Sequence, residues 1–179
     1  VDDKVKHLIE LHADRAYAIA FRLAGNRDDA GDLVQDAFLR AIKYMQSYDP
    51  SLPFEAWLYQ IIRNLYLNGL KLESRRKKVP LSVVDKDEDT SALEDVLADP
   101  DRGPEREVEA MGTKDAVQGA LNGLGPTLRM AVILVDLEGM SREECARTLG
   151  CSLSALDGRL HRARALLRKG LTAYQEGRA

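Results

Sequence analysis

Apolar residues recur along this chain at the spacing of amphipathic helices, and no convincing alternating strand pattern is found. The pattern predicts helices over Val5–Leu23 (one helix or a pair), Asp29–Met45, Glu55–Lys78, Lys114–Leu124 and Thr127–Leu137, then two short helices between Ser141 and Lys169. The stripes expected to face the core include Leu11, Ile42 and Leu153, and the segment 127–137 is expected to be buried on most sides. The sequence therefore predicts an all-α fold.

The stretch from Glu138 to Lys169 carries the signals of a helix-turn-helix. Ser141 and Glu144 are spaced as a capping box, and Gly150 lies where a helix can end in a left-handed turn. Ser152 or Ser154 can cap the second helix. Its basic face comprises Arg159, His161, Arg162, Arg164, Arg168 and Lys169. A basic second helix is typical of one that enters the DNA major groove, although an ordinary surface hairpin with a solvated basic face gives a similar pattern.

Charge is distributed unevenly along the chain. Residues 1–78 hold 13 basic and 11 acidic residues, residues 79–112 hold 3 and 11, and residues 113–179 hold 10 and 7. The net charge of −3 therefore conceals two mildly basic ends, which nucleic acid can bind. We expect a helical domain over 1–78, an acidic flexible linker over 79–112 with one short turn near Leu93–Leu97, and a helix-turn-helix domain over 113–179. The two ends are expected to move independently.

The third predicted helix offers a second nucleic-acid surface. From Trp57 to Lys78 it holds six basic residues and one acid, Glu73. The amides of Asn64 and Asn68 and the rings of Tyr59 and Tyr66 accompany them, and such groups read base edges and stack on unpaired bases. A basic helix end that complements the helix dipole is the alternative. The polar face of the second helix, by physical chemistry alone, is a solvated face.

Other classes of function find little support. No apolar run is long enough for a membrane span, and we expect no signal peptide. Two cysteines give no disulfide framework, which fits the cytoplasm. The histidines are scattered, so neither catalysis nor a cofactor is expected. A zinc or redox site of Cys145, Cys151 and His161 is conceivable, but cysteines packed in a helical core are the better interpretation.

Three segments in order, DLVQDAFLRA, FEAWLYQIIRNL and LEGMSREECARTLGCSLSALDGRLHRARALLRK, resemble the extracytoplasmic-function (ECF) group of bacterial RNA polymerase sigma factors. The resemblance implies two helical domains, sigma-2 and sigma-4, that bind core RNA polymerase. It implies that they direct the polymerase to the −10 and −35 promoter elements, melt DNA and start transcription. It also implies an anti-sigma partner and a linker whose carboxylates mimic phosphates in the polymerase channel.

The resemblance also assigns residues. Those expected to contact the polymerase are Asp32, Gln35, Asp36 and Arg40. Those expected at the −10 element are Tyr48, Asp49 and Phe54, from a loop that pockets a flipped base, with Arg63, Asn64, Asn68 and Lys71 on the following helix. Those expected at the −35 element are Ser154, Asp157, Gly158, Arg159, His161 and Arg162.

Two positions depart from the family pattern. The family reads GTVKSRLHRAR where this chain reads SALDGRLHRAR, so that Asp157 replaces a cation and Gly158 a serine. An aspartate can accept a hydrogen bond from a cytosine amino group but cannot bind a phosphate. We therefore expect a different −35 preference or weak −35 binding. The alternatives are a sigma-like decoy that sequesters an anti-sigma factor without productive DNA binding, and an ordinary helix-turn-helix repressor.

Overall fold

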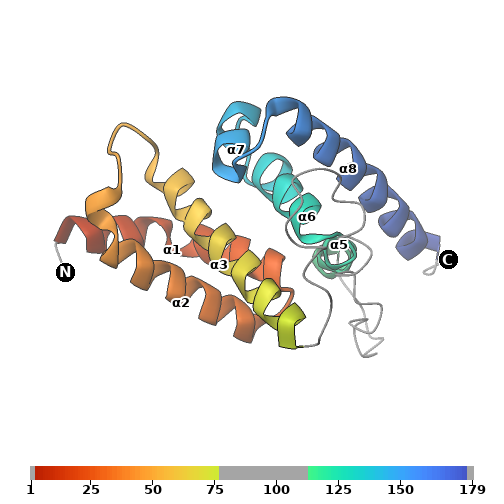
Figure 1. Cartoon of the computed structure of the whole chain (residues 1–179). Coiled ribbons are helices and arrows are strands. Elements are labelled where there is room, and N and C mark those ends of the chain that lie inside the picture. The colour runs from red at the N-terminus through yellow and green to blue at the C-terminus, as the bar shows by residue number, and fades with distance from the viewer. Residues whose placement is uncertain (1–2, 77–112, 177–179) are drawn as a thin grey trace.

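The computed structural model of the chain describes residues 3–76 and 113–176, and every regular element in these ranges is a helix (Figure 1). The α-helices are α1 (Asp3–Ala24), α2 (Arg27–Lys43), α3 (Phe54–Arg76), α5 (Thr113–Asn122), α6 (Pro126–Val132), α7 (Arg142–Leu149) and α8 (Leu153–Glu176). A 3₁₀ turn η1 (Met45–Ser47) and a π-helical segment η3 (Ile133–Leu137) complete them. The all-α prediction is confirmed. The expected linker, its turn near Leu93–Leu97, and Lys77 and Lys78 lie outside the described residues.

Helices α1, α2 and α3 form the first unit, and small side chains line the contact between α1 and α2. Ala16, Ala20, Ala30, Ala37 and Ala41 are completely buried, which lets the helix backbones approach closely. Asn26 begins α2 by accepting a hydrogen bond from the N–H of Asp29, 2.9 Å away. Two expected core residues are exposed instead, Leu11 by 64% and Ile42 by 36%. Both lie at the edge of an apolar stripe.

The second unit is built around the apolar segment that α6 and η3 share. Leu128, Ala131, Ile133 and Leu134 are completely buried, as predicted for this stretch. The predicted single helix changes its winding after Val132, where the π-helix begins and the N–H of Glu138 donates to the carbonyl oxygen of Ile133 at 2.9 Å. Helices α5, α7 and α8 surround this segment (Figure 1). None of the described helices combines the length and apolarity that a bilayer crossing requires.

The two units pack against each other in this structure. Helices α1 and α3 contact α5, α6 and α7, and one buried cluster includes residues of both units, such as Ile19 and Leu58 on one side and Leu124 and Leu128 on the other. The ends of the chain were expected to move independently; here they share an interface.

We expect opposite effects from alanine at two glycines. Gly119 lies exposed in α5, and a Cβ there meets no atom within 4 Å. Gly119→Ala should therefore stabilise the fold by about 0.5–1 kcal/mol, the helix penalty of glycine. Gly25 has φ +80°, and a Cβ there would lie 2.8 Å from Oδ1 of Asn122. Gly25→Ala should cost about 1 kcal/mol or more. Thermal unfolding followed by circular dichroism measures both, and a stabilised Gly25→Ala would contradict the structure.

We expect the two thiols to differ in reactivity. Cys145 is fully buried, and this burial raises the pKa of its thiol to about 12. At pH 8 the folded chain then holds only about one thiolate in ten thousand at Cys145, and the thiolate is the nucleophile. Cys151 is half-buried. Iodoacetamide should modify Cys151 first, and Cys145 only after denaturation, as followed by peptide mass spectrometry. Equal rates in the folded chain would contradict the burial of Cys145.

Candidate nucleic-acid interface

The helix-turn-helix forms by the local rules that its sequence predicts. The Ser141 side chain accepts from the N–H of Glu144, and the Glu144 carboxylate accepts from the N–H of Ser141, which completes the capping box at the start of α7. Gly150 ends α7 at φ 64°, in the left-handed region. Of the two candidate caps for α8, Ser152 is the one used, since its hydroxyl accepts from the N–H of Ala155 at 3.2 Å.

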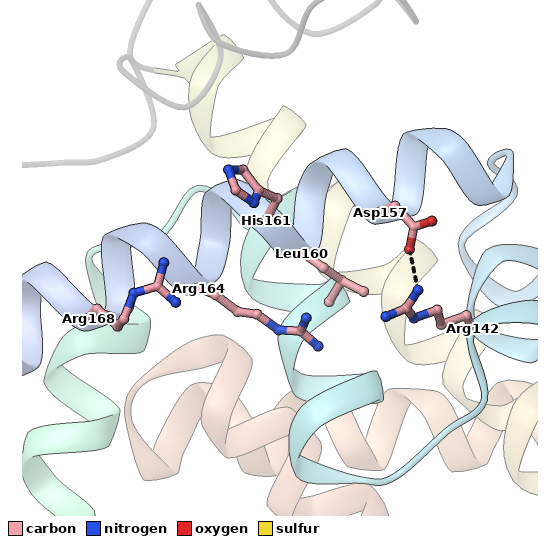
Figure 2. A pocket seen from close by; sticks show the side chains of 6 residues that line it. All are labelled: Arg142, Asp157, Leu160, His161, Arg164 and Arg168. Atoms are coloured by element: carbon pink, nitrogen blue, oxygen red, sulfur yellow. Dashed lines mark ion pairs between the residues drawn. The ribbon is translucent and has the colours of Figure 1, made fainter.

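A shallow pocket of about 340 Å³ lies where α8 faces the start of α7 (Figure 2). Its lining residues are Arg142, Asp157, Leu160, His161, Arg164 and Arg168. Nη1 of Arg142 lies 3.2 Å from Oδ1 of Asp157, and both side chains are about half exposed. In Figure 2, Asp157, Leu160 and Arg164 share one side of α8 and face Arg142, whereas the ring of His161 points away from them. The pocket is cationic, with one carboxylate in it.

A second carboxylate holds Arg164. Its Nη2 and Nε lie 2.6 and 2.9 Å from the two oxygens of Asp136 in η3. This hydrogen bonding raises the pKa of Arg164 above its ordinary value. A two-pronged pair of this kind fixes the side chain in orientation as well as in position. Helix α8 is thereby tied to the segment that precedes the helix-turn-helix.

The residues expected at the −35 element lie along the first turns of α8, and most of them are exposed. Ser154, Asp157, Gly158, His161 and Arg162 are exposed, and Arg159 is half-buried. A Cβ at Gly158 would meet no atom within 4 Å, so no contact within the described residues requires a glycine there. Leu153, expected in the buried stripe, is 45% exposed at the first position of α8. The arrangement leaves this face of α8 accessible to a DNA groove.

The residues expected on α3 at the −10 element divide into exposed amides and partly covered cations. Asn64 and Asn68 are exposed, whereas Arg63 and Lys71 are half-buried. Nη1 of Arg63 donates to Oδ1 of Asn64 at 3.1 Å. Of the two aromatic rings proposed for this surface, Tyr66 is half-buried and Tyr59 is covered: Tyr59 is 2% exposed, and burial raises its pKa to about 12. The hydroxyl of Tyr66 lies 3.4 Å from Nη1 of Arg129 of the second unit.

The loop before α3 is held by an aromatic cluster. The ring of Tyr48 lies 5.5 Å from that of Phe54, edge to face, and 5.3 Å from that of Trp57. The Tyr48 hydroxyl donates to the carbonyl oxygen of Leu52 at 2.6 Å, which closes the loop on itself. The N–H of Ser51 donates to the Asp49 carboxylate and lowers the pKa of that group. Phe54 is 5% exposed and therefore supports the loop from below, while Asp49 lies at its surface.

The face of α2 expected to bind polymerase is open. Asp32, Gln35, Asp36 and Arg40 are all exposed, and Leu39 between them exposes 58% of its surface. This face of α2 is therefore accessible to a partner, with one apolar side chain among its polar groups.

Sequence reasoning missed Arg142. Its place directly after the Ser141 cap gave a weak signal, because a cation at a helix start opposes the helix dipole. Only the fold shows that this cation meets Asp157. Within the described residues no group of three or more histidine, cysteine, aspartate or glutamate side chains could hold a metal ion.

Comparisons with known proteins identify the family of the chain. The family described as Sigma-70 region 2 matches residues 8–76, and the family described as Sigma-70, region 4 matches residues 114–167. The ECF RNA polymerase sigma factor SigE of Mycolicibacterium smegmatis is 38% identical over 167 residues, which cover 93% of this chain and 61% of that protein. EcfG of Rhodopseudomonas palustris is 35% identical over 86% of this chain and 76% of its own length. This chain thus spans about three fifths of the first relative and three quarters of the second.

A solved relative has the same architecture. The sigma factor RpoE of Bartonella quintana, in a co-crystal with the anti-sigma factor NepR, is 27% identical and superposes with a TM-score of 0.71 over 96% of this chain and 98% of that one. CnrH, solved with the cytosolic domain of CnrY, gives a TM-score of 0.63 over 97% of this chain at 27% identity. With both sigma regions matched in order, this chain belongs to the ECF group of RNA polymerase sigma factors.

Proposed function

We propose that this chain binds core RNA polymerase through α2 and directs it to promoters by contacts of α3 with the −10 element and of α8 with the −35 element. The observation that carries this proposal is that one chain has two exposed surfaces. One is the basic face of α8, and the other is the polar face of α2, which includes the exposed Leu39. A repressor would need only the first of these surfaces. The expected compartment is the cytoplasm, where transcription takes place.

An anti-sigma factor is the third proposed partner, because the solved relatives RpoE and CnrH were crystallised with NepR and with CnrY. The comparisons give no support to a decoy, since the relatives named above carry the names of sigma factors. A decoy that does not bind DNA also does not require the cationic pocket of α8, in which Asp136 fixes the side chain of Arg164.

Within the −35 surface we propose separate roles for Arg142 and Asp157. Arg142 projects from the start of α7 and supplies a phosphate contact, which positions the domain without reading sequence. The ion pair engages Oδ1 of Asp157 and thereby orients the second oxygen, which accepts from a cytosine amino group. Asp157 then reads a base, and its negative charge does not simply weaken the binding of a basic surface to DNA.

Run-off transcription with core polymerase on a promoter library tests the function. The chain should give specific transcripts, and Asp36→Lys on α2 should reduce them on all promoters alike, because it reverses a charge on the polymerase face. Asp14→Lys, the same change at an exposed carboxylate of α1, is the control and should leave transcription unchanged. Equal loss in both variants, or no transcript from the unmodified chain, would contradict the proposal.

Selection of the −35 sequences that the chain binds tests the proposed roles of Arg142 and Asp157. Asp157→Asn should move the preference at one base pair from cytosine toward adenine, since an amide pairs with adenine, by about 1–3 kcal/mol or roughly 5- to 150-fold. Arg142→Ala should weaken binding to every sequence, lower the salt dependence by about one phosphate contact, and relax the preference at the base pair that Asp157 reads. A uniform change in Asp157→Asn with no altered preference would show that Asp157 acts only through Arg142.

A further inference from the structure

His12 of α1 is largely covered within the first unit, and none of the surfaces proposed above uses it. Its side chain is 16% exposed, whereas His7 on the same helix lies at the surface. The neighbours of His12 are Phe54 and Glu55, the first two residues of α3. These two residues directly follow the loop that is expected to take an unpaired base of the −10 element. His12 therefore contacts the base of that loop from a different helix.

The contact of His12 with Phe54 is one of ring packing. The two ring centroids lie 5.4 Å apart at an interplanar angle of 38°, which is within the range of favourable aromatic pairs. Phe54 is only 5% exposed, and its ring also lies 5.7 Å from that of Trp57 and 5.5 Å from that of Tyr48. His12 thus adds a fourth ring, from α1, to the three aromatic rings beneath the loop.

The contact of His12 with Glu55 is weaker. Nδ1 of His12 lies 3.8 Å from Oε2 of Glu55, which is too long for a hydrogen bond. The same oxygen lies 2.8 Å from Nη1 of Arg15, so the carboxylate already has a charged partner on α1. Arg15 follows His12 by three residues and therefore lies on the same face of the helix. We attribute the charge contact with α3 to Arg15 and the ring packing to His12.

The loop 48–53 is fixed at both of its ends. At its start, the Tyr48 hydroxyl donates to the carbonyl oxygen of Leu52 at 2.6 Å, and the Tyr48 ring packs on Phe54 and Trp57. At its end, Phe54 begins α3 with its ring against that of His12. Residues 49–53 between these ends are exposed, and Figure 1 shows the loop projecting from the first unit. The position of the Phe54 ring therefore determines where the exposed residues of the loop lie.

We infer that His12 is a positioning residue for the −10 element: its ring holds Phe54 in place and thereby fixes the loop that takes the unpaired base. The inference rests on the proposed function. Taking a base out of its stack costs free energy, and a pocket that is formed in advance offsets more of this cost than one that has to be ordered on binding. His12 acts through Phe54, and the shape of its ring carries this role rather than its charge.

Three variants test the role of the ring. His12→Ala removes the ring, His12→Phe keeps an aromatic ring without its nitrogens, and His7→Ala removes an exposed histidine from the same helix as the control. Run-off transcription with core polymerase is measured on two promoters that differ at one −10 base, chosen for their large ratio with the unmodified chain. The amount of folded protein cancels in this ratio. His12→Ala should lower the ratio by about fivefold or more, because the loop is displaced, whereas His12→Phe and His7→Ala should retain it.

Trp57 provides a second measurement that needs no transcription. It is the single tryptophan of the chain, and its ring lies within the cluster that His12 covers. His12→Ala should shift the fluorescence emission of Trp57 to longer wavelength and increase its quenching by acrylamide, while circular dichroism shows that the helices remain folded. His12→Phe and His7→Ala should match the unmodified chain. If His12→Ala does not fold, His12→Leu, which fills the space with a different shape, replaces it with the same expectations.

The outcomes separate the inference from the proposed function. An unchanged promoter ratio in His12→Ala, an equal loss in His7→Ala, or a loss in His12→Phe as large as in His12→Ala would overturn the positioning role of the ring. Absence of transcripts from the unmodified chain, together with a Trp57 signal that changes in His12→Ala alone, would overturn the proposed function and leave the packing of His12 beneath the loop in place.

Discussion

A carboxylate shielded from water determines how the two halves of this protein meet. Glu138 is held by arginines that precede it by more than a hundred residues, and its burial is tolerable only while they stay in place. The apolar contact between α1, α3 and the α6–η3 segment provides the area of the interface, and the ion pairs provide its orientation. The unit with the proposed −35 surface is therefore positioned by charges on the unit with the proposed −10 surface.

Arginine–carboxylate pairs also occur on the proposed −35 surface. Two of the cations on the helix-turn-helix, Arg142 and Arg164, already have carboxylate partners in the free protein, Asp157 and Asp136. The first pair lies at the surface, where both groups are about half exposed, whereas the second pair has two short hydrogen bonds and is geometrically stronger. The proposed −35 surface thus has two of its cations ordered in advance, and a lower positive potential than its sequence indicates.

Features that depend on neighbouring residues could be predicted from the sequence, whereas features that depend on packing between distant residues could not. The capping box at Ser141 and the left-handed Gly150 depend on neighbouring residues, and both were predicted correctly. Leu11, Ile42 and Leu153 were misplaced because periodicity locates an apolar stripe but not its edge. Among the candidate site residues, the exposure of those on α2 and α8 follows from periodicity, whereas the burial of Phe54 and the approach of Arg142 to Asp157 depend on packing. The contact of Arg15 with Glu138 spans 123 positions, which no local pattern reveals.

The π-helical segment between α6 and α7 determines the direction in which the residues after it point. A π turn holds about one residue more than an α turn, so whatever follows is rotated by about 100° relative to a continuous α-helix. Asp136 and Glu138 lie within and just after this turn, and their carboxylates reach α8 and α1 respectively. Loss of a single residue from the segment 133–137 would restore the α-helical phase and turn both carboxylates away from their arginines at once. The length of this short segment, as much as its composition, therefore links the orientation of α8 to the contact between the two units.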